Sequence, residues 1–180
     1  MPRVHILGAS GCGVSSLGEA LARHLGIPVF DCDAYYWEKT DPPFIKATDI
    51  GSRQNALLAD LNRHDRWICS GSMDSWSAPF EPLFTHVIFL YVPREARAER
   101  LRQRERVRHG TRILEGGDMH VEHLKFIEWA RQYDEGILGG RSLPRREAWL
   151  ARQRCPVRRI EGDLSREHVL KSALEFLHGV

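Results

Sequence analysis

A glycine-rich loop near the amino terminus has the residue types and spacing of a phosphate-binding loop. Residues 8–15 read Gly-Ala-Ser-Gly-Cys-Gly-Val-Ser, with four residues between Gly8 and Gly13. Such glycines let successive backbone N–H groups turn inward, and a following helix adds its positive end, so a polyphosphate finds donors and a favourable dipole together. The residues expected to bind a nucleotide are Gly8, Ser10, Gly11, Cys12, Gly13, Val14, Ser15 and Ser16. The hydroxyl of Ser15 is expected to bind Mg²⁺.

Val14 departs from this pattern, because a lysine at its position would reach the terminal phosphates. A cation about 4 Å from a phosphate contributes on the order of a few kcal/mol at an effective dielectric of about 20. The helix dipole contributes roughly 0.3 to 2 kcal/mol. We therefore predict weakened phosphate binding and a catalytic cation that comes from another segment. The candidates are Arg100, Arg102 and Arg104, carried to the loop by a lid.

These arginines belong to the one strong charge cluster of the chain, residues 94–112, which contains eight arginines and three glutamates. A phosphate clamp is one interpretation of this cluster. A solvated helix face with Glu–Arg pairs is a second interpretation that fits equally well. Nucleic-acid binding is disfavoured, because no aromatic residue that could stack on a base stands among these arginines.

A dinucleotide-binding fingerprint matches the loop less well. A G-x-G-x-x-G pattern that starts at Gly11 would need a glycine where Ser16 stands, and G-x-x-G-x-x-G from Gly8 would need one at Val14. Asp31 or Asp33 could still hold a ribose, so binding of NAD(P) stays open as an alternative.

The loop needs a strand before it and a helix after it, and the apolar pattern predicts both. Strand-like runs lie at residues 4–8, 28–32, 67–69, 86–92 and 157–160. Helical patterns lie at residues 16–25, 55–61, 95–108, 121–133, 145–152 and 167–177. Alternation of this kind is typical of an α/β fold whose parallel sheet is covered by helices on both faces.

The composition fits one ordinary folded domain spanning residues 1–180. Hydrophobic residues make up 42% and charged residues 28%, which excludes wholesale disorder. The net charge of +2 gives no general attraction to nucleic acid or an anionic membrane.

No apolar run approaches the roughly 20 residues that cross a bilayer. The four cysteines form no CxxC pair and are expected to be reduced. We expect a cytoplasmic protein without a membrane partner, and its oligomeric state stays open.

With the loop, Asp31-x-Asp33 and the arginine helix, the chain resembles the P-loop kinases of the nucleoside-monophosphate kinase and shikimate kinase group, and the loop and second strand match this group over the first 33 residues. Nearly the whole chain is similar to a bacterial adenylate kinase-like branch, also labelled AAA-family ATPase, in which a small residue commonly replaces the loop lysine. The segments that carry this similarity include Tyr35-Tyr36-Trp37, Ser70-Gly71-Ser72, Gly116-Gly117-Asp118-Met119 and Gly140-Arg141-Ser142.

The resemblance implies a three-layer P-loop NTPase fold. Its five-stranded parallel sheet would have the order 2-3-1-4-5, with a helical lid at approximately residues 100–142. It also implies that ATP binds at the glycine loop. Nucleoside-monophosphate kinases end their third strand in Asp-Gly, whereas this chain has Ser70-Gly71. Shikimate kinase-like enzymes use a carboxylate at the end of strand two, a role open to Asp31 or Asp33. Strand alternation places both on one face, and Asp33 is the better candidate because it lies nearer the carboxyl-terminal crevice.

The acceptor would lie between the segments after strands two and three. The acceptor-binding candidates are Asp33, Tyr36, Arg53, Ser72 and Arg141, although core packing or solvation would also explain several of them. The catalytic candidates are Asp33, Arg100 and Arg104, and the Mg²⁺ candidates are Ser15 and Asp33. The expected function is phosphoryl transfer from ATP to a nucleotide or a small hydroxyl metabolite. The alternative is a nucleotide-binding protein with little or no turnover.

Overall fold

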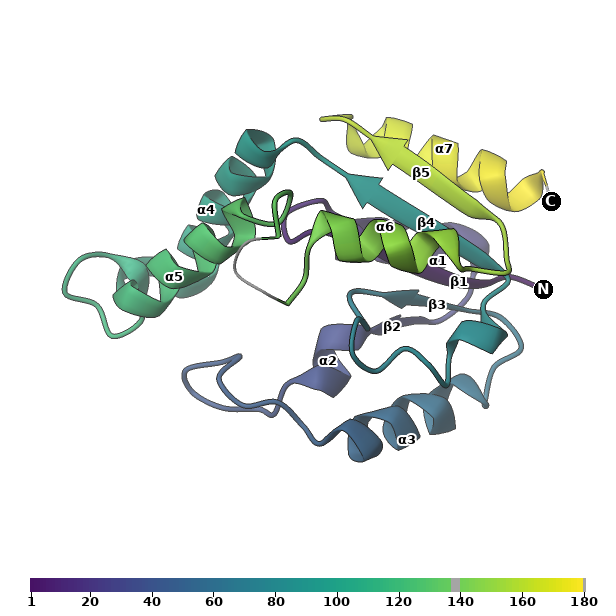
Figure 1. The fold of residues 1–180 in the computed structure, drawn as a ribbon, viewed down its shortest axis with the longest axis horizontal. Coiled ribbons are helices and arrows are strands. Elements are labelled where there is room, and N and C mark those ends of the chain that lie inside the picture. Colours follow the sequence, from purple (N-terminus) through teal and green to yellow (C-terminus); the bar gives the residue numbers. More distant parts are fainter. Residues whose placement is uncertain (137–139, 180) are drawn as a thin grey trace.

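The computed structural model describes residues 1–136 and 140–179, and in these residues one five-stranded sheet forms the centre of the fold (Figure 1). Its strands are β1 (Arg3–Gly8), β2 (Val29–Asp31), β3 (Trp67–Ser70), β4 (His86–Tyr91) and β5 (Val157–Glu161). All neighbouring strands pair in parallel, in the order β2-β3-β1-β4-β5. The α/β class and the strand order expected from the sequence are confirmed.

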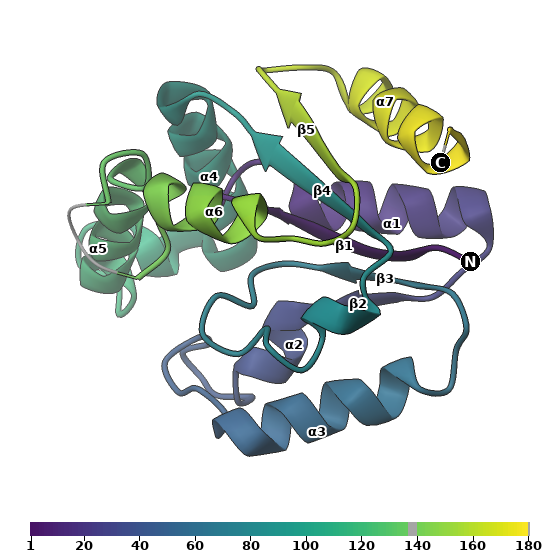
Figure 2. The same ribbon diagram turned by 45° about the vertical axis from the view of Figure 1, so that its right-hand side comes forward.

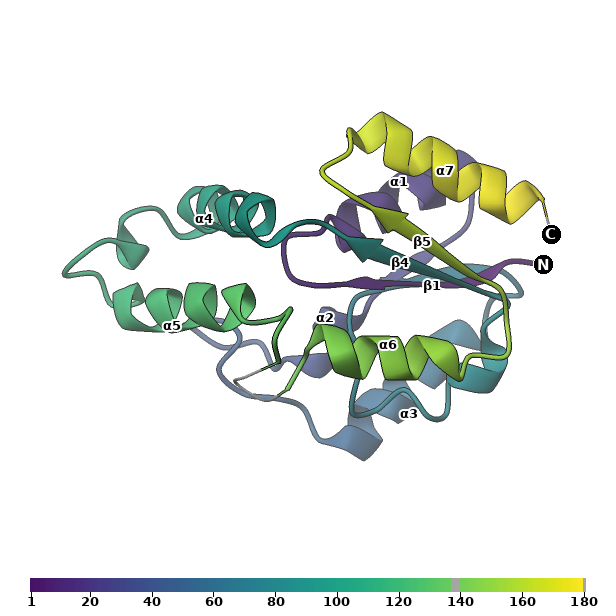
Figure 3. The same ribbon diagram turned by 45° about the horizontal axis from the view of Figure 1, so that its top comes forward.

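Helices cover both faces of the sheet. The helices α1 (Val14–Leu25) and α7 (Arg166–His178) lie beside each other on one face (Figure 2). On the opposite face lie α3 (Ile50–Leu61) and α6 (Leu143–Ala151) (Figure 3). The short helix α2 (Cys32–Tyr36) follows β2, and the 3₁₀ turn η1 (Glu81–Leu83) precedes β4.

The strands are buried on both faces, and successive side chains enter different cores. In β1, Val4 and Ile6 pack with α1 and α7, whereas Leu7 packs with α3 and α6. A strand alternates its side chains between the two faces of a sheet, which explains why β1 and β4 read as almost continuous apolar runs. The two cores hold the carboxyl ends of β1, β2 and β3 in place, and the candidate residues follow these ends.

A helical hairpin projects beyond the sheet and consists of α4 (Arg94–His109), the 3₁₀ turn η2 (Gly110–Ile113) and α5 (His120–Arg131) (Figure 3). We call residues 94–131 the lid. Leu101, Ile127 and Ala130 form its small apolar core. At its far end the Arg112 Nη2 atom lies 2.9 Å from Oδ1 of Asp41, in the segment that follows α2.

Several element boundaries differ from the sequence prediction. The second strand ends at Asp31, because the Asp31 side chain accepts a 3.0 Å hydrogen bond from the Asp33 backbone N–H and caps α2. Asp33 therefore lies in a helix, and the strand-alternation argument that favoured it was wrong. Helix α1 begins at Val14 rather than Ser16, and α3 begins at Ile50, where the Asp49 side chain accepts from the Ser52 backbone N–H.

None of the helices in the described parts of the chain has the length and apolar character needed to span a membrane.

Candidate functional site

The glycine loop joins the end of β1 to the start of α1, as the sequence predicted. Gly11 and Gly13 have φ angles of +88° and +90°, which favour glycine over residues with a Cβ. A Cβ on Gly8 would lie 2.6 Å from the Leu90 carbonyl oxygen of the neighbouring strand. Gly13 precedes α1 without any side chain capping the helix. The first N–H groups of α1 are thus left for an anion, which also gains from the helix dipole.

The Val14 side chain packs toward the sheet. Its Cγ2 atom lies 3.2 Å from the position that a Cβ on Gly8 would occupy, and Val14 is partly buried against the core beneath α1. No charge stands at the position where phosphate-binding loops have their lysine. Val14 and Ser16 were both expected to bind the nucleotide. Because the Val14 side chain packs against the core, its contact with a phosphate would come from its backbone N–H.

Helix α4 passes directly over the glycine loop. A Cβ on Gly11 would lie 2.8 Å from the Arg97 carbonyl oxygen and 3.2 Å from the Leu101 Cγ atom. The side chain of Arg97 is 1% exposed and donates to the Val92 carbonyl oxygen at 2.7 Å. Its Nη1 and Nη2 atoms donate to the two carboxylate oxygens of Asp134 at 3.2 and 2.7 Å. Arg97 and Asp134 thus anchor the start of the lid beside the loop.

The sequence-predicted lid cations already have carboxylate partners. Arg100 forms an ion pair with Asp163, which lies between β5 and α7. Arg104 Nε donates to Glu105 Oε1 at 3.0 Å. The two guanidinium groups are partly exposed, at 38% and 37%. Exposed pairs of this kind contribute little free energy, so a phosphate could replace the carboxylate partners at low cost.

Two candidate residues that are far apart in the sequence meet in space. Nη2 of Arg141 lies 3.5 Å from Oδ1 of Asp33. This oxygen is buried and makes no hydrogen bond within the described residues. The neighbouring carboxyl of Asp31 has a raised pKa, mainly because of burial. Two carboxylates therefore stand at the carboxyl end of β2 and in the first turn of α2, and Arg141 from the segment after the lid forms an ion pair with the second of them.

Arg53 lies in a buried aromatic site. Its side chain comes from α3, and the residue is 4% exposed. The Cζ atom lies 4.2 Å from the centre of the Tyr36 ring and 5.3 Å from the Trp76 ring. Within the described residues its guanidinium has no hydrogen-bond acceptor and no carboxylate partner, and its Nε atom is buried. Cation–π contacts replace only part of the solvation that a buried charge loses.

Ser72 belongs to a buried polar network instead of an open surface. Its hydroxyl donates to Asp74 Oδ2 at 2.8 Å and accepts from Arg146 Nη2 at 3.0 Å. Arg146 Nη1 also lies 2.5 Å from Asp74 Oδ1. This network ties α6 to the segment after β3. The sequence analysis missed Arg146, whose only sequence signal is its place on the apolar face of α6 with Trp149 and Leu150.

No protein-family model matches the chain. Over 174 residues it is 39% identical to the uncharacterized protein YqaC of Bacillus subtilis (strain 168), and the alignment covers 97% of this chain and 96% of YqaC. The chain belongs to the YqaC family. The match extends over both the glycine loop and the lid, because it covers almost the full length of both proteins.

Solved structures show that this YqaC-family chain has the fold of the P-loop kinases. Shikimate kinase from Bacteroides thetaiotaomicron has a TM-score of 0.56 and 20% identity, and the alignment covers 99% of each chain. A gluconokinase from Sinorhizobium meliloti 1021 has a TM-score of 0.53 and 19% identity, over 99% of this chain and 92% of the kinase. Deoxyadenosine kinase from M. mycoides has a TM-score of 0.50 and 13% identity, over 98% of this chain and 99% of the kinase.

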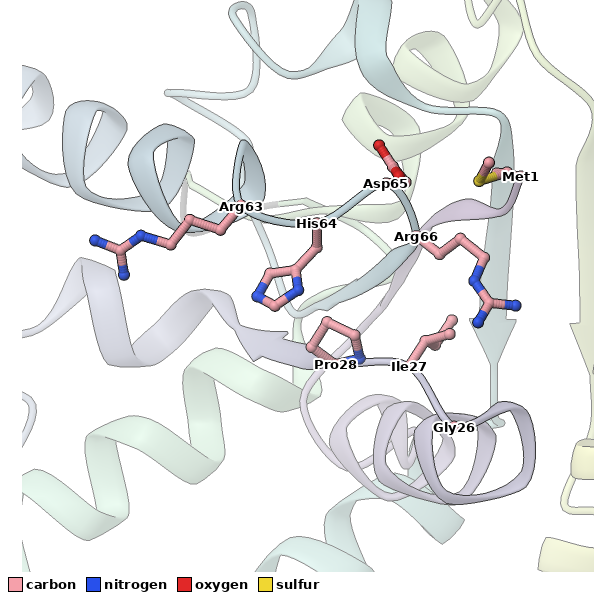
Figure 4. Close-up of a pocket in the computed structure, with 8 residues that line it drawn as sticks. All are labelled: Met1, Gly26, Ile27, Pro28, Arg63, His64, Asp65 and Arg66. Carbon is pink, nitrogen blue, oxygen red and sulfur yellow. The ribbon is translucent and has the colours of Figure 1, made fainter.

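A surface hollow of about 310 Å³ lies at the other end of the sheet, next to Met1 and Pro28 (Figure 4). Arg63 and Arg66 border it, but Figure 4 shows their guanidinium groups directed away from each other, on opposite sides of the hollow. None of the candidate residues lies there.

The residues near the loop suit a magnesium ion that is bound mainly through nucleotide phosphates. Across residues 1–136 and 140–179, no group of three or more His, Cys, Asp or Glu side chains is arranged to hold a metal ion alone. Ser15 stands exposed in the first turn of α1, and its hydroxyl is the type of oxygen ligand that Mg²⁺ accepts. Because Mg²⁺ keeps several waters and binds phosphate oxygens, one or two protein oxygens are enough for such a site.

Proposed function

We propose that the protein transfers the γ-phosphoryl group of ATP to a small acceptor that carries a hydroxyl and an anionic group. The backbone N–H groups of residues 11–15 bind the ATP phosphates. Ser15 and Asp33 hold Mg²⁺, which supplies charge neutralisation when it is bound with the nucleotide. The likeness of the fold to small-molecule and nucleotide kinases supports the reaction class.

The observation that carries this proposal is the buried charge of Arg53, which no carboxylate compensates within residues 1–136 and 140–179. A buried guanidinium without an acidic partner is costly, so it indicates a place where a ligand brings the missing anion. Arg53 comes from α3 and stacks on Tyr36, which belongs to α2 together with Asp33. An acceptor carboxylate or phosphate on Arg53 would therefore place the rest of the molecule near the Asp33 carboxylate.

Asp33 then acts on the acceptor hydroxyl as well as on the Mg²⁺ shell. The hydroxyl oxygen forms a bond to the γ-phosphorus, the bond from this phosphorus to the bridging oxygen breaks, and ADP leaves. The hydroxyl proton passes to the Asp33 carboxylate. Arg141 orients this carboxylate, and Arg100 and Arg104 neutralise the charge of the transferred phosphoryl group.

A nucleotide-binding protein with little turnover is the second candidate, and the packing of Val14 toward the core favours it. Without a loop lysine, and with Ser70 where a carboxylate would order the Mg²⁺ waters, the site has fewer charged groups than P-loop kinases use. Under this candidate the lid arginines keep their carboxylate partners after ATP binds.

Thermal unfolding with ligands tests both candidates. ATP, GTP and NADPH are each titrated with and without Mg²⁺, and a ligand present at 100 times its Kd should stabilise the fold by about 2.7 kcal/mol. No shift with either triphosphate at millimolar concentration would contradict both candidates, and a shift with NADPH alone would indicate dinucleotide binding. If ATP binds, ADP formation with a panel of hydroxy acids and nucleoside monophosphates separates a kinase from an inert binder.

A further inference from the structure

A carboxylate in the segment after β3 is held from one side by a buried arginine. Asp74 Oδ1 lies 2.5 Å from Arg146 Nη1, and Asp74 Oδ2 accepts a 2.8 Å hydrogen bond from the Ser72 hydroxyl. Arg146 Nη2 donates to the same hydroxyl at 3.0 Å. The Arg146 side chain is 2% exposed, whereas the Asp74 side chain is 35% exposed. The Asp74 carboxylate therefore has one side that is held in place and another side that is open to solvent.

A tight turn presents Asp74 at the surface. The Trp76 backbone N–H donates to the Met73 carbonyl oxygen at 2.9 Å, so residues 73–76 form a β-turn with Asp74 at its second position. Met73 and Trp76 are buried in the core beneath α3 and anchor the two ends of the turn. The backbone of Asp74 is thus positioned by the packing of its neighbours, and its side chain by Arg146 and Ser72.

The turn borders the residues proposed to bind the acceptor. The centre of the Trp76 ring, two residues after Asp74, lies 5.3 Å from the Arg53 Cζ atom in α3. At the other end of the segment, a Cβ on Gly71 would lie 3.0 Å from the Cys32 Cβ atom in α2. The segment that carries Asp74 is therefore in contact with both α2 and α3.

The start of α6 reaches Asp74 and Asp33 together. Arg141, just before this helix, forms an ion pair with Asp33, and Arg146, in its second turn, forms one with Asp74. Asp33 follows β2 and Asp74 follows β3, and these two strands are neighbours in the sheet. Ligands of open parallel sheets bind at the carboxyl ends of the strands. Both carboxylates are therefore placed where an acceptor would lie.

Asp74 has hydrogen-bonding capacity left for a ligand. An ionised carboxylate can accept about four hydrogen bonds. Arg146 and Ser72 supply one partner for each oxygen, and no further donor from residues 1–136 and 140–179 lies within hydrogen-bond distance. The open positions on the two oxygens suit two adjacent hydroxyl groups of one molecule. Because Arg146 balances the charge of Asp74, repulsion of an anionic acceptor is reduced.

We propose that Asp74 binds the acceptor and selects molecules that carry two adjacent hydroxyl groups, with Arg146 and Ser72 as its positioning residues. This inference rests on the proposed function and names the class of acceptor for that site. Sugar acids and ribonucleoside monophosphates both carry such a pair of hydroxyl groups, and the experiment separates these two sources.

Steady-state kinetics of the full chain with ATP and Mg²⁺ measures this selectivity. The first readout is the ratio of kcat/KM for gluconate to kcat/KM for ω-hydroxyhexanoate, which has the same chain length, carboxylate and terminal hydroxyl without the hydroxyls between them. The second is the ratio for AMP to dAMP, which lacks one of the two adjacent ribose hydroxyls. The original protein should favour gluconate at least about 100-fold, or AMP at least about tenfold, because each hydrogen bond to a charged group contributes about tenfold or more. Turnover of only one pair identifies the source of the hydroxyls.

Two variants separate ligand binding from the structural role of Asp74. Asp74→Glu keeps a charge for Arg146 and displaces the carboxylate by one methylene. Asp74→Asn combined with Arg146→Met removes both charges and leaves no unpaired buried cation. Each variant should lower the ratio at least about tenfold, with the KM for ATP unchanged. Glu81→Gln is the matched control, because Glu81 also links the segment after β3 to α6, accepting from Ser77 at 2.6 Å and Trp149 at 2.8 Å. It should keep the original ratio.

Several results would overturn the inference while the proposed function stands. One is an unchanged ratio in both Asp74 variants, which would show that Asp74 serves only to hold Arg146. Another is an equal loss of selectivity in Glu81→Gln, which would show that the ratio reports the packing of α6. A third is ADP formation only with acceptors that lack adjacent hydroxyls. If no hydroxy acid or nucleoside monophosphate supports ADP formation, the proposed function fails together with this inference. Urea unfolding of each variant checks that the fold is preserved.

Discussion

The Arg141 guanidinium lies 3.5 Å from the Asp33 carboxylate, and this contact links the segment after the lid to α2. The two groups form an ion pair without a hydrogen bond to Asp33 Oδ1 within the described residues. The two residues come from separate segments of the chain, and folding brings them together at the carboxyl end of the sheet.

Asp33→Asn should remove the proposed Mg²⁺ and proton-accepting role. We expect turnover to fall by at least about 100-fold, which is the lower range for the loss of a general base, with ATP affinity nearly unchanged. Steady-state kinetics and ATP titration measure the two effects. Asp31→Asn is the matched control, because asparagine caps a helix as well as aspartate does. Full activity of Asp33→Asn would refute the role given to this residue.

Arg53→Met should separate acceptor binding from stability. The substitution removes a buried charge that has no acidic partner in the described parts of the chain, so the free energy of unfolding should stay within about 1 kcal/mol of the original value or rise. The KM for the acceptor that supports turnover should increase at least about tenfold, while the KM for ATP stays the same. Urea unfolding and steady-state kinetics provide these measurements. Arg53→Lys, which keeps the charge, is the control, and a marked loss of stability in Arg53→Met would show that Arg53 is structural.

Asp134→Asn should destabilise the protein strongly, because it leaves Arg97 buried without its partner. Breaking such a pair costs about 3 to 5 kcal/mol, and replacing both members with Arg97→Met and Asp134→Asn should recover part of this loss. Burial opposes ionisation of Asp134, but Arg97 and Arg94 outweigh it, so the pKa of this carboxyl is lowered. Its contribution is therefore present above the ordinary pKa of 3.8 and is lost as the pH falls below it. Urea unfolding at several pH values measures this. An acid transition identical in the original protein and Asp134→Asn would contradict the prediction.

The stability of the native fold should decrease below neutral pH because of His5. This residue is 1% exposed, and its Nε2–H donates to the Gly71 carbonyl oxygen at 3.0 Å. Burial lowers its pKa from 6.5 to about 4. The unfolded chain thus binds a proton between these pH values and the native chain does not. As the pH decreases from 6.5 to about 4, the free energy of unfolding should fall by up to about 1.4 kcal/mol per pH unit.

Urea unfolding of His5→Gln tests this pH dependence. Glutamine keeps an N–H donor for Gly71 and has no charge to gain. The slope of stability against pH should therefore be smaller than in the original protein. It should not vanish, because burial also lowers the pKa of His86. Equal slopes in the two proteins would show that His5 does not contribute.

Much of the fold follows from local patterns. Glycines at 8, 11 and 13 between an apolar strand and an amphipathic helix predicted the loop, and the structure places it between β1 and α1. The boundary at Asp31 was missed, because Asp31 and Asp33 alternate like strand residues, whereas the cap at Asp31 starts a helix. A side chain that bonds its own backbone can override an extended pattern.

The contacts between the residues of the candidate site could not be predicted from the sequence. Asp33, Tyr36, Arg53 and Arg141 were named individually, and the structure brings Asp33 to Arg141 and Tyr36 to Arg53. The sequence did not predict that Arg97 pairs with Asp134 or that Arg146 pairs with Asp74. Pairs of this kind join residues from separate elements, and hydrophobic periodicity carries no information about which elements will meet.

The sequence by itself determined the parallel α/β design, the glycine loop and the missing lysine at Val14, because each depends on residue type and short-range spacing. Only the tertiary structure decided which arginines form ion pairs with carboxylates. Ion pairs engage Arg97, Arg100 and Arg104, whereas Arg53 is buried and has no counter-charge among the residues that the structure describes. The physical reason is that the state of a charge depends on burial and on partners brought close by folding, and these distances do not exist in the linear chain.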